Sequence, residues 1–83
     1  MSRHSFAFGR ALRQLRKARG LTQESLAFDS RLDRGYISIL ESGRCSPTLG
    51  TMISLCKALD ISLTELAAET ERQQDASGTY SAR

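Results

Sequence analysis

The stretch LTQESLAFDSRLDRGYISILESG, residues 21–43, contains two short helical patterns in close succession. Thr22 is a good N-cap for the first, and Leu26 and Ala27 supply the apolar side of a helix that should end near Asp29. Two short helices joined by about four residues cannot pack in parallel and instead cross steeply. The stretch therefore predicts a helix-turn-helix motif.

The second helix of this motif, expected over residues 33–42, has an unusual outer face. Asp33 is its candidate N-cap, and Ile37 and Leu40 lie on the side that faces the core. The opposite side lacks the Lys and Glu of a solvated face and carries Gly35, Ser38, Ile39 and Ser42. The glycine lowers helix propensity by about 1 kcal/mol relative to alanine. Because small side chains let another surface approach the backbone closely, this face is expected to press against a partner.

A helix of this kind can enter the major groove of DNA, where base edges form a code that side chains read. Arg34, at the exposed N-terminal end, is placed for a bidentate contact to guanine, and Ile39 can meet a thymine methyl group. Residues 1–47 hold nine Lys and Arg against four Asp and Glu, a net charge of +5, whereas residues 48–83 have a net charge of −2. The first half of the chain is therefore the surface that a polyanion would choose.

An amphipathic helix is predicted on the N-terminal side of the motif. Phe8, Leu12 and Leu15 recur at helical spacing, which favours a helix over residues 6–19 that ends at Gly20. Strand alternation is absent from the whole sequence. We therefore expect an all-α fold.

Two more helices are predicted on the C-terminal side. After Pro47, a fourth helix capped by Thr48 is expected to turn inward Leu49, Met52, Ile53, Cys56 and Leu59. The sequence SLTE fits a capping box and opens a fifth helix, which runs to about Gln74 with Leu63 and Leu66 inward. The prediction is five helices followed by a flexible tail.

The length and composition exclude several classes of protein. A chain of 83 residues is one domain, and at this size folding hides only about 60% of the surface, so a homodimer is expected. No apolar run approaches the roughly 20 residues of a membrane span, which predicts a cytoplasmic protein. Cys45, Cys56 and one histidine are too few for a zinc site, so no metal is expected and both cysteines should be free thiols. The sequence has no cofactor motif and no recognisable pairing of a nucleophile with a base. An enzyme is therefore not expected.

The order of these motifs resembles the Cro/cI-repressor-type helix-turn-helix regulators, also called the xenobiotic response element family. The matching segments are LRQLRKARGLTQESLA, YISILESGR and SPTLGTMISLCKALDISLTEL. The resemblance implies a lambda-repressor-like DNA-binding domain over residues 8–68, with the motif at about 23–42, and a polar C-terminal extension over residues 69–83. A shorter segment, LDRGYIS, is similar to the recognition helices of restriction-modification controller proteins.

The resemblance implies a role for each matching position. Residues that would face bases are Arg34, Gly35, Ser38 and Ile39, with Tyr36 against the sugar-phosphate edge or a base step. Residues expected to bind phosphates are Thr22, Gln23, Ser42 and Arg44, where Gln23 acts through its amide and the helix N-terminus, together with Arg31, which departs from the family pattern. Arg16 and Glu41 match the structural ion pair that ties the first helix to the third.

Two positions depart from the family pattern, and one group is ambiguous. Arg31 stands where the family usually has a glycine with a left-handed backbone, which costs another residue on the order of 1 kcal/mol. Either the turn differs, or the strain is tolerated and Arg31 reaches a phosphate. Phe28, at a position that is often polar, is either a satellite core residue or a contact surface. For Arg10, Arg13 and Lys17, a solvated basic face and direct phosphate contact are both open.

The predicted function is a sequence-specific transcriptional regulator, such as a repressor. Two copies joined through the fifth helix would place their recognition helices about 34 Å apart on a pseudo-palindromic operator. RNA polymerase or another protein is a further candidate partner. The alternatives are an antitoxin or adaptor that mainly binds a protein through the segment from Glu69, and a redox-responsive regulator that uses Cys45.

Overall fold

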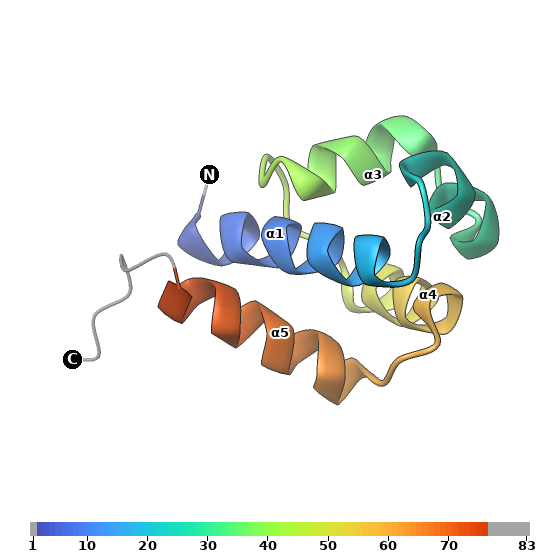
Figure 1. Cartoon of the computed structure of the whole chain (residues 1–83). Helices are drawn as coiled ribbons and strands as arrows, with labels where there is room; N and C mark the ends of the chain where they lie inside the picture. The colour runs from blue at the N-terminus through green and yellow to red at the C-terminus, as the bar shows by residue number, and fades with distance from the viewer. Residues whose placement is uncertain (1, 77–83) are drawn as a thin grey trace.

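Five helices make up the described part of the chain, residues 2–76 of a computed structural model (Figure 1). They are α1 (Arg3–Ala18), α2 (Gln23–Ser30), α3 (Arg34–Glu41), α4 (Leu49–Leu59) and α5 (Leu63–Ala76). No strand occurs within residues 2–76, so the predicted all-α class and number of helices are confirmed. None of these helices is long and apolar enough to cross a membrane.

Local hydrogen bonds start four of the helices where the sequence predicts. The side chains of Thr22, Asp33 and Thr48 accept a bond from a backbone N–H in the first turns of α2, α3 and α4, at 3.0, 2.8 and 3.1 Å. At α5, the Glu65 N–H donates to Ser62 Oγ at 3.0 Å, and the Ser62 N–H donates to Glu65 Oε1 at 2.9 Å. This reciprocal pair is the predicted capping box.

The predicted start of α1 at residue 6 is wrong, because the helix begins at Arg3. Ser2 is its N-cap and accepts a hydrogen bond from the Ser5 N–H at 3.0 Å. The first turn has no apolar side chain on the core side, so the hydrophobic pattern alone placed the start too late. Serine at an N-cap was the signal that could have found it.

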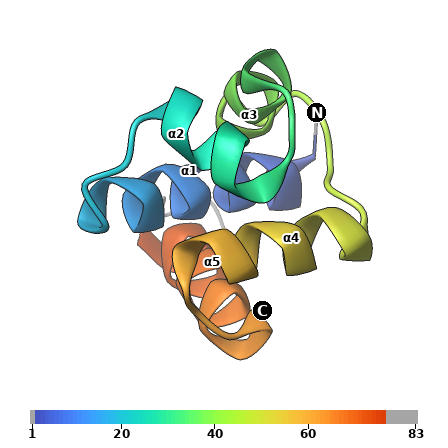
Figure 2. The same cartoon turned by 90° about the vertical axis from the view of Figure 1, so that its right-hand side faces the viewer.

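The first helix lies at the centre of the fold. α3 packs on one side of α1 and α5 on the other, and α4 packs against α2 and α5 (Figure 1). Turned by 90°, the molecule shows α2 and α3 above α1, with α4 and α5 below it (Figure 2). A Cβ atom on Gly9 would collide with the backbone carbonyls of Leu40 and Glu41, so only glycine lets α3 lie this close to α1.

All five helices contribute to one hydrophobic core. Its largest fully buried side chains are Leu12, Leu26, Ile37, Leu40, Leu55, Leu59 and Leu66. Cys56 is also buried there, as predicted. Because every helix supplies at least one of these side chains, the position of α3 depends on the packing of the whole domain.

Three apolar side chains that were predicted to face the core are exposed. Leu49, Ile53 and Leu63 expose 57%, 42% and 39% of their surface. The first residues of α4 and α5 lie beyond the end of the core, and the inward side of α4 is rotated away from Ile53. That side consists of Met52, Leu55, Cys56 and Leu59, which recur at helical spacing.

The C-terminal extension is partly helical. α5 continues to Ala76, two residues beyond the predicted Gln74. Residues 69–76, on which the protein-partner alternative depends, therefore belong to α5. The predicted flexible tail lies outside the described residues from position 77 onward.

Candidate nucleic-acid interface

The turn between α2 and α3 has a left-handed backbone at Arg31. Its φ is 61° and its ψ is 36°, a conformation that glycine adopts most easily. The Leu32 N–H donates to the Ala27 carbonyl at 2.9 Å, and the Arg31 N–H donates to the Phe28 carbonyl at 3.3 Å. These bonds satisfy two of the last four carbonyls of α2. The turn thus keeps the left-handed geometry, and Arg31 carries a strain of about 1–2 kcal/mol.

A buried hydrogen-bonded network joins the first three helices. Arg16 donates from Nε to Glu41 Oε2 at 2.7 Å and from Nη2 to Glu41 Oε1 at 3.0 Å, which is the predicted ion pair. Its Nη1 donates to the Leu21 carbonyl at 2.8 Å, just before α2. The Arg16 side chain exposes 9% of its surface and the Glu41 side chain 3%. Since α1, the start of α2 and the end of α3 all take part, the network fixes their relative positions.

The network also holds Gln23, the first residue of α2. Its Nε2 donates to Glu41 Oε1 at 3.0 Å, so the carboxylate accepts from two helices at once. The sequence predicted only a phosphate contact for this amide. The bond to Glu41 sets the direction of the amide and occupies one of its two N–H groups.

Within α3 itself, the outer face carries no carboxylate, although the N-cap Asp33 places an exposed one beside Gly35. Ile37 and Leu40 are fully buried, as predicted, while Arg34 and Gly35 are exposed and Ile39 exposes 37% of its surface. The only acid within α3, Glu41, is turned into the network. The exposed side chains of α3 that follow Arg34 are therefore uncharged, and most of them are small.

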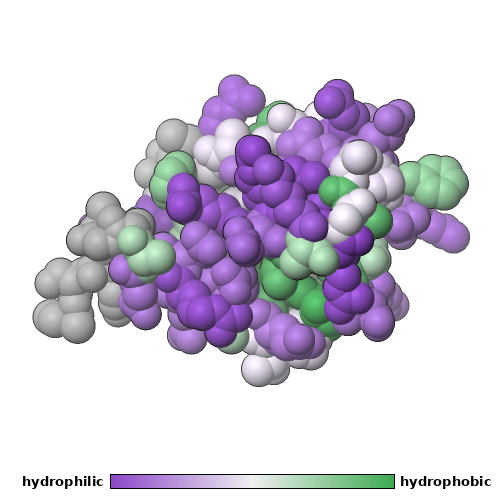
Figure 3. Space-filling view, in the orientation of Figure 1, coloured by the Kyte–Doolittle hydropathy of each residue, from purple (hydrophilic) through white to green (hydrophobic). Residues whose placement is uncertain are grey.

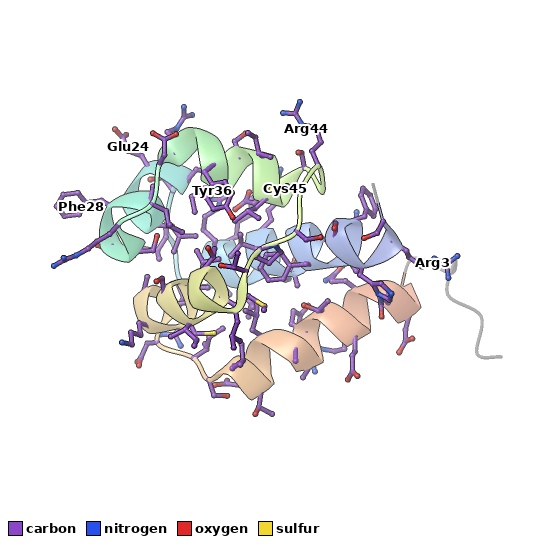
Figure 4. The ribbon with its side chains drawn as sticks, turned by 180° about the vertical axis from the view of Figure 1, so that it is seen from behind. Arg3, Glu24, Phe28, Tyr36, Arg44 and Cys45 are labelled. Carbon is purple, nitrogen blue, oxygen red and sulfur yellow. The ribbon has the colours of Figure 1, made fainter. Side chains whose placement is uncertain are left out.

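Tyr36 is placed differently from the other candidate base-reading residues. It is half-buried and packs against the hydrophobic core, toward the middle of the molecule in Figure 4. Ser38 is also half-buried, on the exposed side of α3. Tyr36 therefore offers a base less free surface than Arg34 does.

Two of the candidate phosphate ligands form local hydrogen bonds. The Thr22 hydroxyl caps α2 and donates to Ser25 Oγ at 3.1 Å. Ser42 donates to the Ile39 carbonyl at 2.7 Å and accepts from Arg44 Nε at 3.1 Å. Arg44 itself is exposed and extends from the chain just beyond α3 (Figure 4). The structure thus places an arginine at each end of α3.

A groove of about 460 Å³ lies where α1, α2 and the start of α3 meet. Its lining includes Lys17, Thr22, Gln23 and Arg34. The sequence did not place Lys17 beside Arg34, and no local pattern could have done so, because the two residues are far apart in the chain. Only the packing of α1 against α3 brings them together.

Phe28 projects from α2 into solvent (Figure 4) and exposes 84% of its surface. The satellite-core alternative for this residue is therefore wrong. The other alternative, that Phe28 forms part of a surface that contacts another molecule, stays a prediction.

The two cysteines differ in their surroundings. Cys45 is a free thiol that is half-buried against the core. The redox alternative for this residue stays a prediction. Burial raises the pKa of the Cys56 thiol, and the negative charge of Glu65 raises it further. A thiol of this kind is poorly reactive. Within residues 2–76, no group of His, Cys, Asp and Glu is placed to hold a metal ion.

Comparison with known proteins assigns the family. Residues 7–68 match the model of a family described as a helix-turn-helix domain. The chain belongs to this helix-turn-helix family. As a member, it is a DNA-binding regulator and not an enzyme.

Three similar proteins support this membership. An uncharacterized HTH-type transcriptional regulator, y4dJ of Sinorhizobium fredii, is 41% identical over 58 residues, which cover 70% of this chain and 75% of that protein. The restriction-modification controller protein C.AhdI from Aeromonas hydrophila is 47% identical, with a TM-score of 0.73 over 75% of this chain and 94% of that one. The clp gene regulator ClgR from Corynebacterium glutamicum is 33% identical, with a TM-score of 0.86 over 90% of this chain and 80% of that one. Both resemblances drawn from the sequence, to Cro/cI-type regulators and to controller proteins, are confirmed.

The Arg16→Ala variant of this helix-turn-helix protein should be strongly destabilised. Removing the arginine leaves the Glu41 carboxylate buried without its counter-charge, which typically costs about 3–5 kcal/mol. Urea unfolding measures the loss. Arg72→Ala is the matched control, because Arg72 pairs with Glu69 at 2.7 Å while its side chain is 66% exposed, and such a pair contributes about 0–1 kcal/mol. Equal losses in the two variants would contradict the structural role of the network.

The Arg31→Gly variant should be more stable than the natural chain. It relieves about 1–2 kcal/mol of left-handed strain, while the greater conformational freedom of glycine in the unfolded chain costs about 0.5–1 kcal/mol. The net gain in the free energy of unfolding, measured with urea, should therefore be between about 0 and about 1.5 kcal/mol. Asp60→Gly is the control for the introduction of glycine at a left-handed position, because Asp60 has a similar φ of 57° at the end of α4 and lies outside the helix-turn-helix motif. If Arg31 also binds a phosphate, only Arg31→Gly will make DNA binding less sensitive to salt. A loss of stability in Arg31→Gly would mean that the turn is not strained.

Proposed function

We propose that this regulator binds a pseudo-palindromic DNA operator as a homodimer, with α3 of each subunit in the major groove. The observation that carries the proposal is the exposed face of α3, where small uncharged residues lie between Arg34 and Arg44. Gly35 lets the helix backbone approach the base edges. Arg34 is then placed to read a base and Arg44 to bind a phosphate beyond the helix.

The start of α2 supports a second backbone contact. The amide of Gln23 is oriented by Glu41 and keeps one N–H group for a phosphate oxygen. The N-terminus of α2, where Gln23 is the first residue, also favours an anion. Arg31, exposed in the turn, is a further candidate for the backbone. These contacts would position α3 and would not themselves read sequence.

The dimer contact is proposed on α5 and the neighbouring start of α4. Leu49, Ile53 and Leu63 are exposed apolar side chains on these two helices. Of these three, Leu63 also lines a pocket of about 360 Å³, together with Phe8, Met52 and Leu66. Exposed apolar side chains together with an apolar pocket are typical of a surface that a second copy covers.

The sign of regulation would follow from the operator. An operator that overlaps the polymerase site gives repression, and one beside it allows activation through contact with RNA polymerase or another protein. Phe28 is an exposed side chain that such a partner could contact.

Arg34→Ala should weaken operator binding by about 1–3 kcal/mol and relax base preference at one position of each half-site, because the bidentate contact is lost. Arg44→Ala should instead weaken all sequences alike and lower the salt dependence, because it removes a phosphate contact. Fluorescence anisotropy on the gene's own promoter and on scrambled duplexes separates the two effects. Lys57→Ala, on the exposed side of α4, is the control. An unchanged ratio of operator to scrambled affinity in Arg34→Ala would rule out base reading by Arg34.

Leu63→Glu should convert the dimer to a monomer without lowering the stability of the fold. The side chain is 39% exposed in one chain, so a charge is tolerated there, but it would be desolvated in the proposed contact. Sedimentation velocity measures the oligomeric state. Phe28→Glu places the same charge on an exposed apolar position of α2 and should leave the dimer intact. A Leu63→Glu variant that stays dimeric would move the interface elsewhere.

A further inference from the structure

A row of four exposed cations leads away from the proposed base-reading end of α3. They are Arg34, Lys17, Arg13 and Arg10. The ion pairs within residues 2–76 use Arg16, Arg19 and Arg72, so none of the four has a carboxylate partner there. Their charge is therefore available to an outside partner.

Two grooves make the row continuous. Lys17 and Arg34 line the groove of about 460 Å³ at the junction of α1, α2 and α3. Lys17 also lines a second groove, of about 220 Å³ between α1 and α5, together with Arg10 and Arg13. Because one lysine belongs to both grooves, the four cations form an uninterrupted basic track from α3 along α1.

Helix geometry and local contacts organise this basic track. Residues 10, 13 and 17 are three and four positions apart, so they share one face of α1. Arg10 lies 5.9 Å from the centre of the Phe6 ring and donates from Nε to Gln73 Oε1 at 3.2 Å. In the space-filling view, the face that α1 crosses is mostly hydrophilic (Figure 3). The track is thus presented on the surface with one of its arginines already oriented.

The basic track is unfavourable for the isolated fold. Like charges three or four residues apart on a helix repel each other. The first 23 residues contain six Lys and Arg and no Asp or Glu, so α1 offers no local compensation. Glu24, exposed on α2, is the one acid that lines either groove. A polyanion that runs along α1 accounts for this arrangement, and the stability of the fold does not.

We propose that the basic track binds the sugar-phosphate backbone of the DNA that flanks each operator half-site. The inference rests on the proposed function, because Arg34 marks the end of the track that meets the half-site. From residue 10 to residue 17, α1 rises about 10 Å. This length corresponds to about three nucleotides along one DNA strand. The track therefore adds contacts that depend on the length of the duplex and not on its sequence.

The test compares two duplexes that carry the same operator, recovered by selection from a random-sequence pool. One duplex ends at the half-sites, and the other extends about one helical turn beyond each of them. The full chain should bind the extended duplex more tightly and with a steeper salt dependence. In the Arg13→Gln/Lys17→Gln variant, which keeps only Arg10 of the three cations on α1, most of the gain from the extension should be lost. If Arg13 and Lys17 each contact one phosphate in each subunit, the variant loses four phosphate contacts. The slope of log affinity against log salt on the extended duplex should then become shallower by about 3.6.

The matched control is the Arg3→Gln/Lys57→Gln variant, which removes the same charge from exposed positions outside the track. It should keep the gain from the extended duplex. If the natural chain binds the short duplex and the extension adds neither affinity nor salt dependence, the basic track is wrong and the proposed function stands. If the Arg13→Gln/Lys17→Gln variant weakens binding equally on both duplexes, the cations act by long-range attraction and the contact is wrong. If the natural chain prefers no sequence at all, the proposed function itself fails.

Discussion

The rest of this structure depends on the buried carboxylate of Glu41. It accepts hydrogen bonds from Arg16 on α1 and Gln23 on α2 while it is itself the last residue of α3. A charge at this depth is tolerable only because its partner is charged and because its oxygens are hydrogen-bonded. Hydrophobic packing holds the helices together but allows small rotations and shifts. The directional bonds at Glu41 remove that freedom at the place where α2 and α3 must keep a fixed angle.

The same carboxylate shapes the electrostatics of the outer surface. Glu41 is the only acid within α3, and its charge is neutralised inside the domain by Arg16. The exposed face of α3 is left with Arg34, and the carboxylate nearest to it is that of the N-cap Asp33, which accepts a hydrogen bond from the Gly35 N–H. α1 contributes no acid either, and its exposed cations lie along the neighbouring grooves. Stability and the affinity for a polyanion thus arise from one arrangement.

Features that rest on local chemistry could be predicted from the sequence, and features set by tertiary packing could not. The caps at Thr22 and Thr48 each involve residues three positions apart, so their sequence signature is complete within a few letters. The bond between Gln23 and Glu41 joins two helices and leaves no such signature. Ile53 shows a second limit, because apolar spacing defines a stripe on α4 but does not fix which edge of the stripe meets the core. The exposed apolar residues missed in this way became the proposed dimer surface.

Arg31 shows how the fold separates what the backbone requires from what the surface requires. The turn requires a left-handed residue, and glycine would meet that requirement without strain. The domain also has a left-handed Asp60, but aspartate tolerates this conformation better than arginine does. The turn therefore explains the conformation at position 31 and gives no reason for an arginine there. The proposed phosphate contact would supply such a reason, because the exposed guanidinium stands next to the helix-turn-helix motif as a cation for the partner that α3 is proposed to meet.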